Sequence, residues 1–217
     1  MLDLPPEVPP HILKAVRGFI AFANNPNQTE AVFDMADGLR QTDLYQQFIE
    51  YAHSQPAVAQ IIQERYFAPI ADLERLLNCP QGSLGYHYAA QMKRAGLQPD
   101  FYRNIAIEDD YSYIAMRMRQ THDVWHIITG FGTDLAGELG LQAFTLAQTR
   151  SPLAVTILAA SAMYALKSSS PLNPLIESMQ QGWRMGENAH PFLAQKWEED
   201  WEKPLSEWRA DLKVEAV

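Results

Sequence analysis

Apolar residues recur along this chain at spacings of three and four positions, which is the period of an amphipathic helix. The first apolar face runs through residues 12–23 and is formed by Ile12, Leu13, Val16, Phe19, Ile20 and Ala23. No stretch alternates apolar and polar residues with a period of two, so the pattern predicts no β-sheet. The chain is therefore expected to be all-α.

Asn, Gly, Ser and Pro interrupt the helical pattern and indicate where the elements begin and end. Shorter helices are expected to start at Thr29, Thr42, Pro56 and Pro69. Longer helices are expected over residues 82–95, 109–129, 133–149, 152–167, 171–188 and 191–212. No linker is long enough to separate domains, so residues 1–217 are predicted to form one compact multi-helix domain with the long helices at its centre. Residues 1–10 are rich in proline and are expected to be extended.

Composition narrows the classes of function. Of the 217 residues, 47% are hydrophobic and 20% are charged, which is ordinary for a globular protein. The net charge of −9 argues against non-specific binding to nucleic acid and against a purely electrostatic grip on an anionic membrane. The single cysteine, Cys79, excludes an intrachain disulfide. The most apolar run, residues 152–166, is shorter than the roughly 20 residues needed to cross a bilayer, so it predicts a buried helix.

The stretch that contains the most informative polar residues, 121–140, reads THDVWHIITGFGTDLAGELG. His122 and His126 are four positions apart, so on a helix they lie about 40° apart around the axis and about one turn from each other. Both imidazoles can then reach one metal ion, as they do in the related HExxH motif. Asp123 can join the same site or orient a ligand by hydrogen bonding. Paired histidines also occur on helices without a metal, and that structural role is the alternative.

Glu138 follows His126 by twelve positions, a separation of about 18 Å on one straight helix. Gly130 and Gly132 interrupt the helix, and Thr133 can cap a second helix that runs back beside the first. Such a turn would bring the Glu138 carboxylate to the two imidazoles. The predicted metal ligands are His122, Asp123, His126 and Glu138.

The HDxxH motif, followed by eleven residues and then a glutamate, resembles the signature of the coenzyme Q biosynthesis protein 4 family. The segments GSLGYHYA at 82–89 and YIAMRMRQTHD at 113–123 are similar to further segments of that family. A later run resembles its C-terminal pattern and reads QGWRMGENAHPFLAQKWEEDWEKPLSEWR. These segments follow one another in the family's order from residue 82 onward.

The resemblance implies an all-helical protein of ubiquinone-type quinone synthesis that binds a prenylated aromatic or prenyl-phosphate lipid in an apolar cavity. It also implies zinc at the four predicted ligands, peripheral association with a membrane, and association with other enzymes of the pathway. The activity ascribed to the family is a lyase-type oxidative decarboxylation at ring carbon 1, which replaces the carboxylate of a polyprenyl-hydroxybenzoate with a hydroxyl. A non-catalytic lipid-binding scaffold with a structural metal is the alternative. The resemblance favours the enzyme and leaves both open.

Four further residues are candidate contacts for the lipid. Arg119 lies three positions before His122 and can hold a carboxylate or phosphate beside the metal, whereas Arg117 points elsewhere. The alternative for both arginines is solvation or pairing with an acidic residue of 108–110. The remaining candidates are Gly82, Gly85 and Tyr86. Small residues at 159–162 leave room for a prenyl chain, or they permit close helix packing.

The metal and the reaction do not fit together easily. Two imidazoles with carboxylates suit zinc, and they also suit iron, manganese or cobalt, with magnesium kept open. Decarboxylation with hydroxylation needs an oxidant, which zinc does not supply. An HD-type phosphohydrolase is a third function class, disfavoured because it needs additional His and Asp ligands on other helices. The histidines without supporting spacing are expected to be solvated or hydrogen-bonded, and they are His11, His53, His87 and His190.

The N-terminus, MLDLPPEVPPH, carries acidic residues and no arginine before Arg17, unlike a signal or transit peptide. We therefore expect a bacterial cytoplasmic protein that is peripheral to an inner or thylakoid-type membrane. A homodimer is one candidate assembly. The quinone and its prenyl length stay open.

Overall fold

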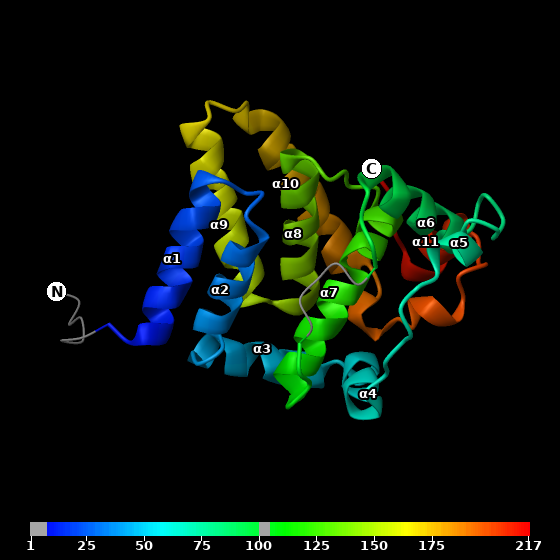
Figure 1. The fold of residues 1–217 in the computed structure, drawn as a ribbon, viewed down its shortest axis with the longest axis horizontal. Coiled ribbons are helices and arrows are strands. Elements are labelled where there is room, and N and C mark those ends of the chain that lie inside the picture. Colours follow the sequence, from blue (N-terminus) through cyan, green and yellow to red (C-terminus); the bar gives the residue numbers. More distant parts are fainter. Residues whose placement is uncertain (1–7, 100–104) are drawn as a thin grey trace. The chain divides into compact units, whose positions relative to one another are not determined.

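The structure is a computed structural model that describes residues 8–99 and 105–217 (Figure 1). Its elements are α1 (Pro10–Asn24), α2 (Thr29–Leu39), α3 (Asp43–Ser54), α4 (Pro56–Glu64), α5 (Leu73–Leu76), α6 (Leu84–Ala95), α7 (Asp110–Thr129), α8 (Leu135–Thr149), α9 (Pro152–Lys167), α10 (Leu172–Asn188), the 3₁₀ helices η1 (Phe192–Ala194) and η2 (Trp197–Glu199), and α11 (Leu205–Leu212). Every regular element in the described ranges is helical, which confirms the all-α prediction. Residues 1–7 of the predicted extended segment lie outside the described residues. Pro10 opens α1 because its ring suits the first turn of a helix.

The chain divides into two compact units, and each has its own packing. One unit comprises Met1–Tyr51 and Asp134–Gly186, and the other comprises Ala52–Thr133 and Glu187–Val217. The prediction of a single domain stays a prediction. No helix in the described part of the chain is both long and apolar enough to span a membrane.

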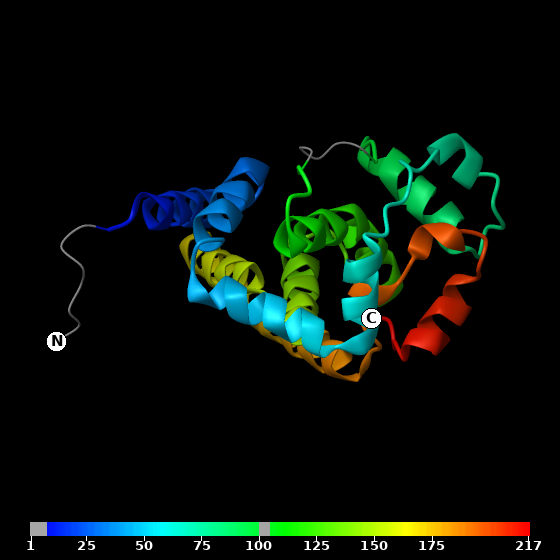
Figure 2. The ribbon, with the colours of Figure 1, turned by 90° about the horizontal axis from the view of Figure 1, so that it is seen from below.

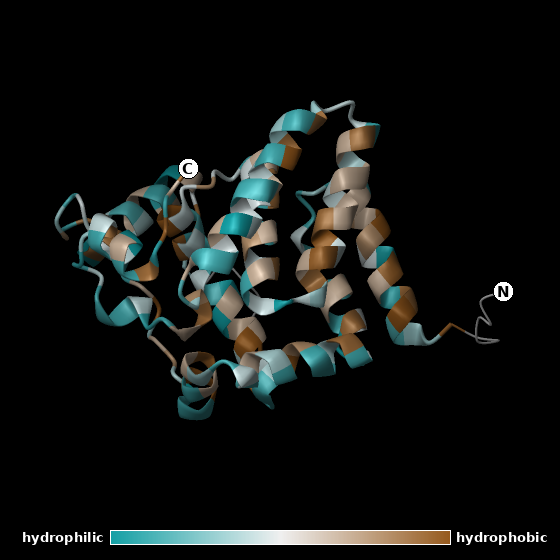
Figure 3. Ribbon diagram, turned by 180° about the vertical axis from the view of Figure 1, so that it is seen from behind, coloured by the Kyte–Doolittle hydropathy of each residue, from teal (hydrophilic) through white to brown (hydrophobic). Residues whose placement is uncertain are grey.

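The first unit is built around α1, α2 and α9, which lie side by side in both Figure 1 and Figure 2. Their shared core is formed by Phe22, Ala23, Ala31, Met35, Ile157 and Ala160. Ala160 is fully buried there, so this small residue permits close helix packing, the alternative to a prenyl tunnel. Figure 3 shows α9 pale to brown along most of its length, as its apolar sequence predicts.

In the same unit, α10 crosses α8 at very short range. A methyl group placed on Gly182 would lie 1.9 Å from the carbonyl oxygen of Gly140, so only glycine fits at this crossing. Gln148 Nε2 donates a 2.6 Å hydrogen bond to the Gly186 oxygen. These contacts hold the two helices together by backbone approach as well as by apolar packing.

The second unit contains α7, the longest described helix. Asp109 and Ser112 form a capping box that satisfies the N–H groups at its start. Arg117 is completely buried on this helix and forms an ion pair with Glu198, with 2.7 Å between Nη1 and Oε1. The alternative considered for Arg117, solvation or pairing with an acidic residue of 108–110, is therefore wrong, because η2 brings a distant carboxylate to it.

Two further local predictions are wrong. Residues 191–212 do not form one helix, because Pro191 and Pro204 interrupt the chain and leave η1, η2 and the short helix α11. Asp134, and not Thr133, caps α8, where its side chain accepts a 2.8 Å hydrogen bond from Gly137 N. A carboxylate caps a helix start at least as well as a hydroxyl.

Candidate metal centre

The two histidines of the HDxxH motif lie in the last turns of α7. His126 is buried, with 3% of its surface exposed, and His122 is half-buried. Their Nε2 atoms are 3.2 Å apart, and their rings meet edge to face at 86°. The spacing of four positions therefore places both imidazoles on the same side of the helix.

The tautomer of His126 follows from its second hydrogen bond. Its Nδ1 is 3.0 Å from the carbonyl oxygen of Phe131. Because a carbonyl only accepts, Nδ1 carries the proton. When the ring is neutral, its Nε2 therefore has a lone pair, and this lone pair points to His122. Phe131 reaches this position because Gly130 takes a φ of +85° and reverses the chain at the end of α7.

Glu138 lies in the first turn of α8, four residues after the Asp134 cap. The two histidines belong to the second unit and Glu138 to the first, so Glu138 as a third ligand stays a prediction. Asp123 is half-buried. Its role as ligand or orienting group stays a prediction.

The donor set fits a small divalent ion. Two nitrogens bound to one tetrahedral zinc at about 2.0–2.1 Å stand about 3.3 Å apart, close to the 3.2 Å between the two Nε2 atoms. A metal-bound histidine commonly donates a hydrogen bond from its far nitrogen to a protein carbonyl, and the Phe131 carbonyl accepts such a bond from His126 Nδ1. A direct hydrogen bond between the imidazoles is the alternative explanation for the same distance.

The residues predicted to contact lipid lie in separate local settings. Arg119 is half-buried on α7, three positions before His122. Gly85 is buried, and its N–H donates a 2.8 Å hydrogen bond to the Trp201 oxygen, so its small size serves packing in the α6 region. Gly82 has open space around its Cα, and Tyr86 is half-buried. Lipid contact at these positions stays a prediction.

The sequence did not point to an apolar groove in the first unit. The groove has a volume of about 340 Å³ and is lined by Ala143, Leu146, Leu158, Ile176, Met179, Gln180, Trp183 and Arg184. Its lining comes from α8, α9 and α10. The helical spacing of Ile176, Met179 and Trp183 on one face of α10 was the signal that could have identified it.

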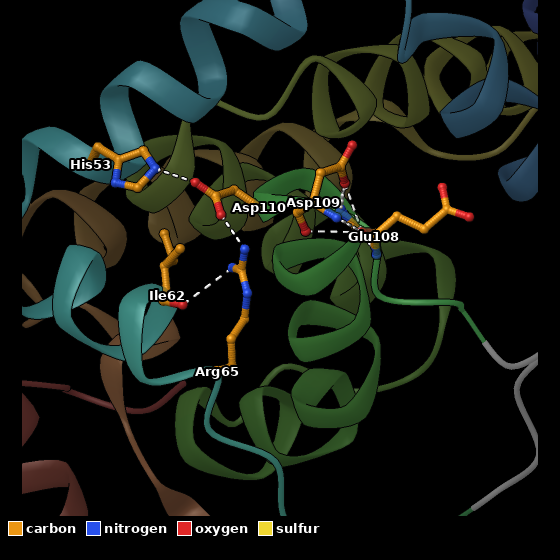
Figure 4. A network of polar contacts seen from close by, with 7 residues as sticks. His53, Ile62, Arg65, Glu108, Asp109 and Asp110 are labelled. Carbon is orange, nitrogen blue, oxygen red and sulfur yellow. Dashed lines mark hydrogen bonds and ion pairs between the residues drawn. The ribbon is translucent and has the colours of Figure 1, made fainter.

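A second polar cluster, shown in Figure 4, lies at the start of α7. His53 Nε2 is 2.7 Å from Asp110 Oδ2, and Arg65 forms an ion pair with the same carboxylate. Burial raises the pKa of Asp110, but the hydrogen bonds from Arg65 and His53 outweigh burial and lower it below its usual value. His53 is thus hydrogen-bonded, as predicted, and the cluster joins the C-terminal end of α3 to α7.

Comparison with known proteins identifies the family. The model of the family "Coenzyme Q (ubiquinone) biosynthesis protein Coq4" matches residues 8–217. The mitochondrial ubiquinone biosynthesis protein coq4 of Talaromyces stipitatus is 27% identical over 98% of this chain and 77% of its own length. The corresponding protein of Aspergillus flavus is 28% identical over 97% of this chain and 78% of its own length.

A solved structure gives the same assignment. A crystal structure from Nostoc punctiforme, described as a candidate ubiquinone biosynthesis protein, superposes with a TM-score of 0.84 at 35% identity. The match covers 94% of this chain and 98% of that one. The chain therefore belongs to the coenzyme Q (ubiquinone) biosynthesis protein Coq4 family.

Proposed function

We propose that this chain binds a prenylated ring intermediate of quinone synthesis beside a divalent metal ion held by His122, His126 and Glu138. Membership of the family places the chain in ubiquinone biosynthesis. The observation that carries the proposal is the imidazole pair with its fixed tautomer, because a buried Nε2 lone pair aimed at a second Nε2 is a preformed binding site for a cation. Zinc is the first candidate.

The residues around the ion would have distinct roles. A bound divalent ion supplies a fixed positive charge for the carboxylate or phenolate of the ring. Arg119 is placed on the same helix to hold a second anionic group of the substrate. Asp123 is the candidate for moving a proton, since it is half-buried and lies beside His122 in the chain.

The chemical step that we propose is the exchange of the ring carboxylate at carbon 1 for a hydroxyl. This exchange releases CO₂ and oxidises the ring by two electrons, so an assay must supply an oxidant such as dioxygen. The alternative is a scaffold in which the ion joins helices and the bound lipid recruits other enzymes of the pathway. An HD-type phosphohydrolase is disfavoured, because the described residues hold no further group of metal-binding side chains.

The apolar groove of the first unit is the proposed place for the prenyl chain. Its volume of about 340 Å³ is at the lower end of the range for small-molecule sites. Along α9, Val155, Met163 and Leu166 are exposed by 50%, 53% and 66%. This apolar surface supports a peripheral contact with the bilayer in which such lipids reside.

Metal analysis tests the site first. Purified wild type is expected to carry about one divalent transition metal per chain, and His126→Ala is expected to lose it. His190→Ala is the matched control, since His190 is exposed and belongs to no group of candidate ligands in the described residues. Equal metal content in wild type and His126→Ala would refute the site.

Turnover then separates enzyme from scaffold. The protein is loaded with each candidate metal and incubated with a prenylated 4-hydroxybenzoate and dioxygen. The CO₂ released from the substrate is then measured. The enzyme hypothesis expects metal-dependent product that His122→Ala and Glu138→Ala abolish. If no metal supports turnover, and the same variants lose only stability, the scaffold is the better description.

A further inference from the structure

At the end of α7 that carries His126, each of the last four carbonyls of the helix accepts a hydrogen bond. The last four carbonyls of a helix have no partner within it and must find one elsewhere. In α7 these are the carbonyls of residues 126–129. The Gly130 N–H donates to His126 O at 2.9 Å, and the Val217 N–H donates to Thr129 O at 3.1 Å.

Arg209 satisfies the two carbonyls between them. From α11, its Nη2 donates to Ile127 O at 2.9 Å and its Nε donates to Ile128 O at 3.0 Å. A guanidinium presents these donors in one rigid plane, so both carbonyls are held in a fixed relation. Its positive charge also complements the negative end of the helix dipole.

The same segment restrains the turn that follows α7. Gly130 lies so close to Val217 that a methyl group on it would be 2.6 Å from the Val217 oxygen. Gly130 leads directly into Phe131, whose carbonyl orients the His126 ring. The orientation of the imidazole thus depends on a helix end and a turn that both contact the segment 205–217.

We infer that Arg209 is a positioning residue for the candidate metal centre, acting through the last turn of α7 on His126. The inference rests on the proposed metal site for its functional meaning. Arg209 acts on the backbone, because it donates to the carbonyls of Ile127 and Ile128, which directly follow His126.

The test compares Arg209→Ala and Arg209→Lys with wild type in two measurements. The first is hydrogen exchange of the metal-free protein over residues 126–131, which Arg209→Ala should accelerate by at least about 10-fold. The second is Co²⁺ and Zn²⁺ affinity with the Co²⁺ ligand-field spectrum, where loss of a supporting contact should weaken binding by about 10-fold and alter the spectrum. Arg209→Lys should lie between wild type and Arg209→Ala in both measurements, because a lysine ammonium cannot reproduce the planar pair of donors of a guanidinium.

Two control variants separate positioning from general stability. Glu198→Gln weakens the second unit at η2, away from the end of α7, and Arg94→Ala removes an exposed arginine of α6. Both are expected to bind Co²⁺ as wild type does. If Arg209→Ala does not fold, Arg209→Lys carries the same comparison.

The outcomes are distinct. Unchanged exchange over residues 126–131 in the Arg209 variants overturns the inference, and so does faster exchange with unchanged metal affinity and spectrum. A loss of affinity in Glu198→Gln equal to that in the Arg209 variants also overturns it, since general destabilisation would explain both. If wild type binds no metal at all, the proposed function fails, and the exchange measurement still decides whether Arg209 holds the end of α7.

Discussion

Removing the buried charge of Arg117 should destabilise the second unit strongly. The guanidinium is 0% exposed, and it donates to both oxygens of Glu198, at 2.7 Å and 3.3 Å, and to the Gln195 oxygen at 3.1 Å. The Glu198 side chain is only 13% exposed, so Arg117→Met leaves a nearly buried carboxylate without its partner. Breaking a buried pair from one side costs about 3–5 kcal/mol. For a chain of 217 residues this corresponds to a fall in Tm of about 6–20 °C.

Urea unfolding followed by tryptophan fluorescence measures this loss. Trp197 is a suitable reporter because it is fully buried in η2, beside Glu198 in the chain. Lys93→Met is the matched control, since the ion pair of Lys93 with Glu74 is exposed by 41% and 78% and should contribute less than about 1 kcal/mol.

The double variant Arg117→Met with Glu198→Leu tests the reasoning itself. Removing both charges leaves no uncompensated ion, so the double variant should be more stable than either single variant. If the two losses simply add, desolvation of an unpaired charge is not the cause. The argument from burial would then be refuted.

Three further results are expected. Gly182→Ala should destabilise the first unit by about 1–3 kcal/mol or more in thermal unfolding, because its methyl group would lie 1.9 Å from Gly140 O. Gly82→Ala is the control and should not destabilise the protein, since its methyl group would have nothing within 4 Å. Equal effects of the two substitutions would contradict the close crossing of α8 and α10. Burial, then the charge of Glu198, raises the pKa of Tyr66 to about 12 from 10.0, so the folded state keeps a proton that the unfolded state loses. The free energy of unfolding should therefore fall as pH rises between these two values, and it should fall less in Tyr66→Phe than in wild type. Unfolding midpoints measured across this pH range test this, and identical profiles for the two proteins would exclude Tyr66 as the cause. Liposome flotation should show weak binding that resists added salt, since the net charge is −9, and binding abolished by moderate salt would contradict an apolar contact.

Most helices could be read from the sequence, because their signals are local. The 3.6-residue period and the glycine at 130 predicted a helix over residues 109–129, and α7 is Asp110–Thr129. The proximity of His122 to His126 follows from the same period. The predicted helix over 191–212 was wrong because its apolar residues pack on α7 and on one another from short 3₁₀ turns, which have no helical period of their own.

Distant partners were not predictable in this way. The sequence favoured an exposed Arg117, since most arginines are exposed, and only the folded chain brings Glu198 to it across 81 positions. Arg209 is the last residue of the C-terminal run that resembles the family pattern, but nothing in the sequence marks it as the donor to Ile127 and Ile128, which are 82 and 81 positions away. The groove could not be predicted either, because its lining residues come from three helices, α8, α9 and α10, and they form a groove only when these helices pack together.

The sequence by itself determined the all-helical class, most boundaries of the helices before residue 191 and the facing of the two histidines, because each depends on residues within one or two turns. Tertiary structure alone decided the burial of Arg117 and the support of the α7 end by Arg209. Those features depend on hydrogen bonds that are made only when segments far apart in the chain exclude water together. The period of apolar residues indicates which face of a helix is buried, but it does not indicate which other segment packs against that face.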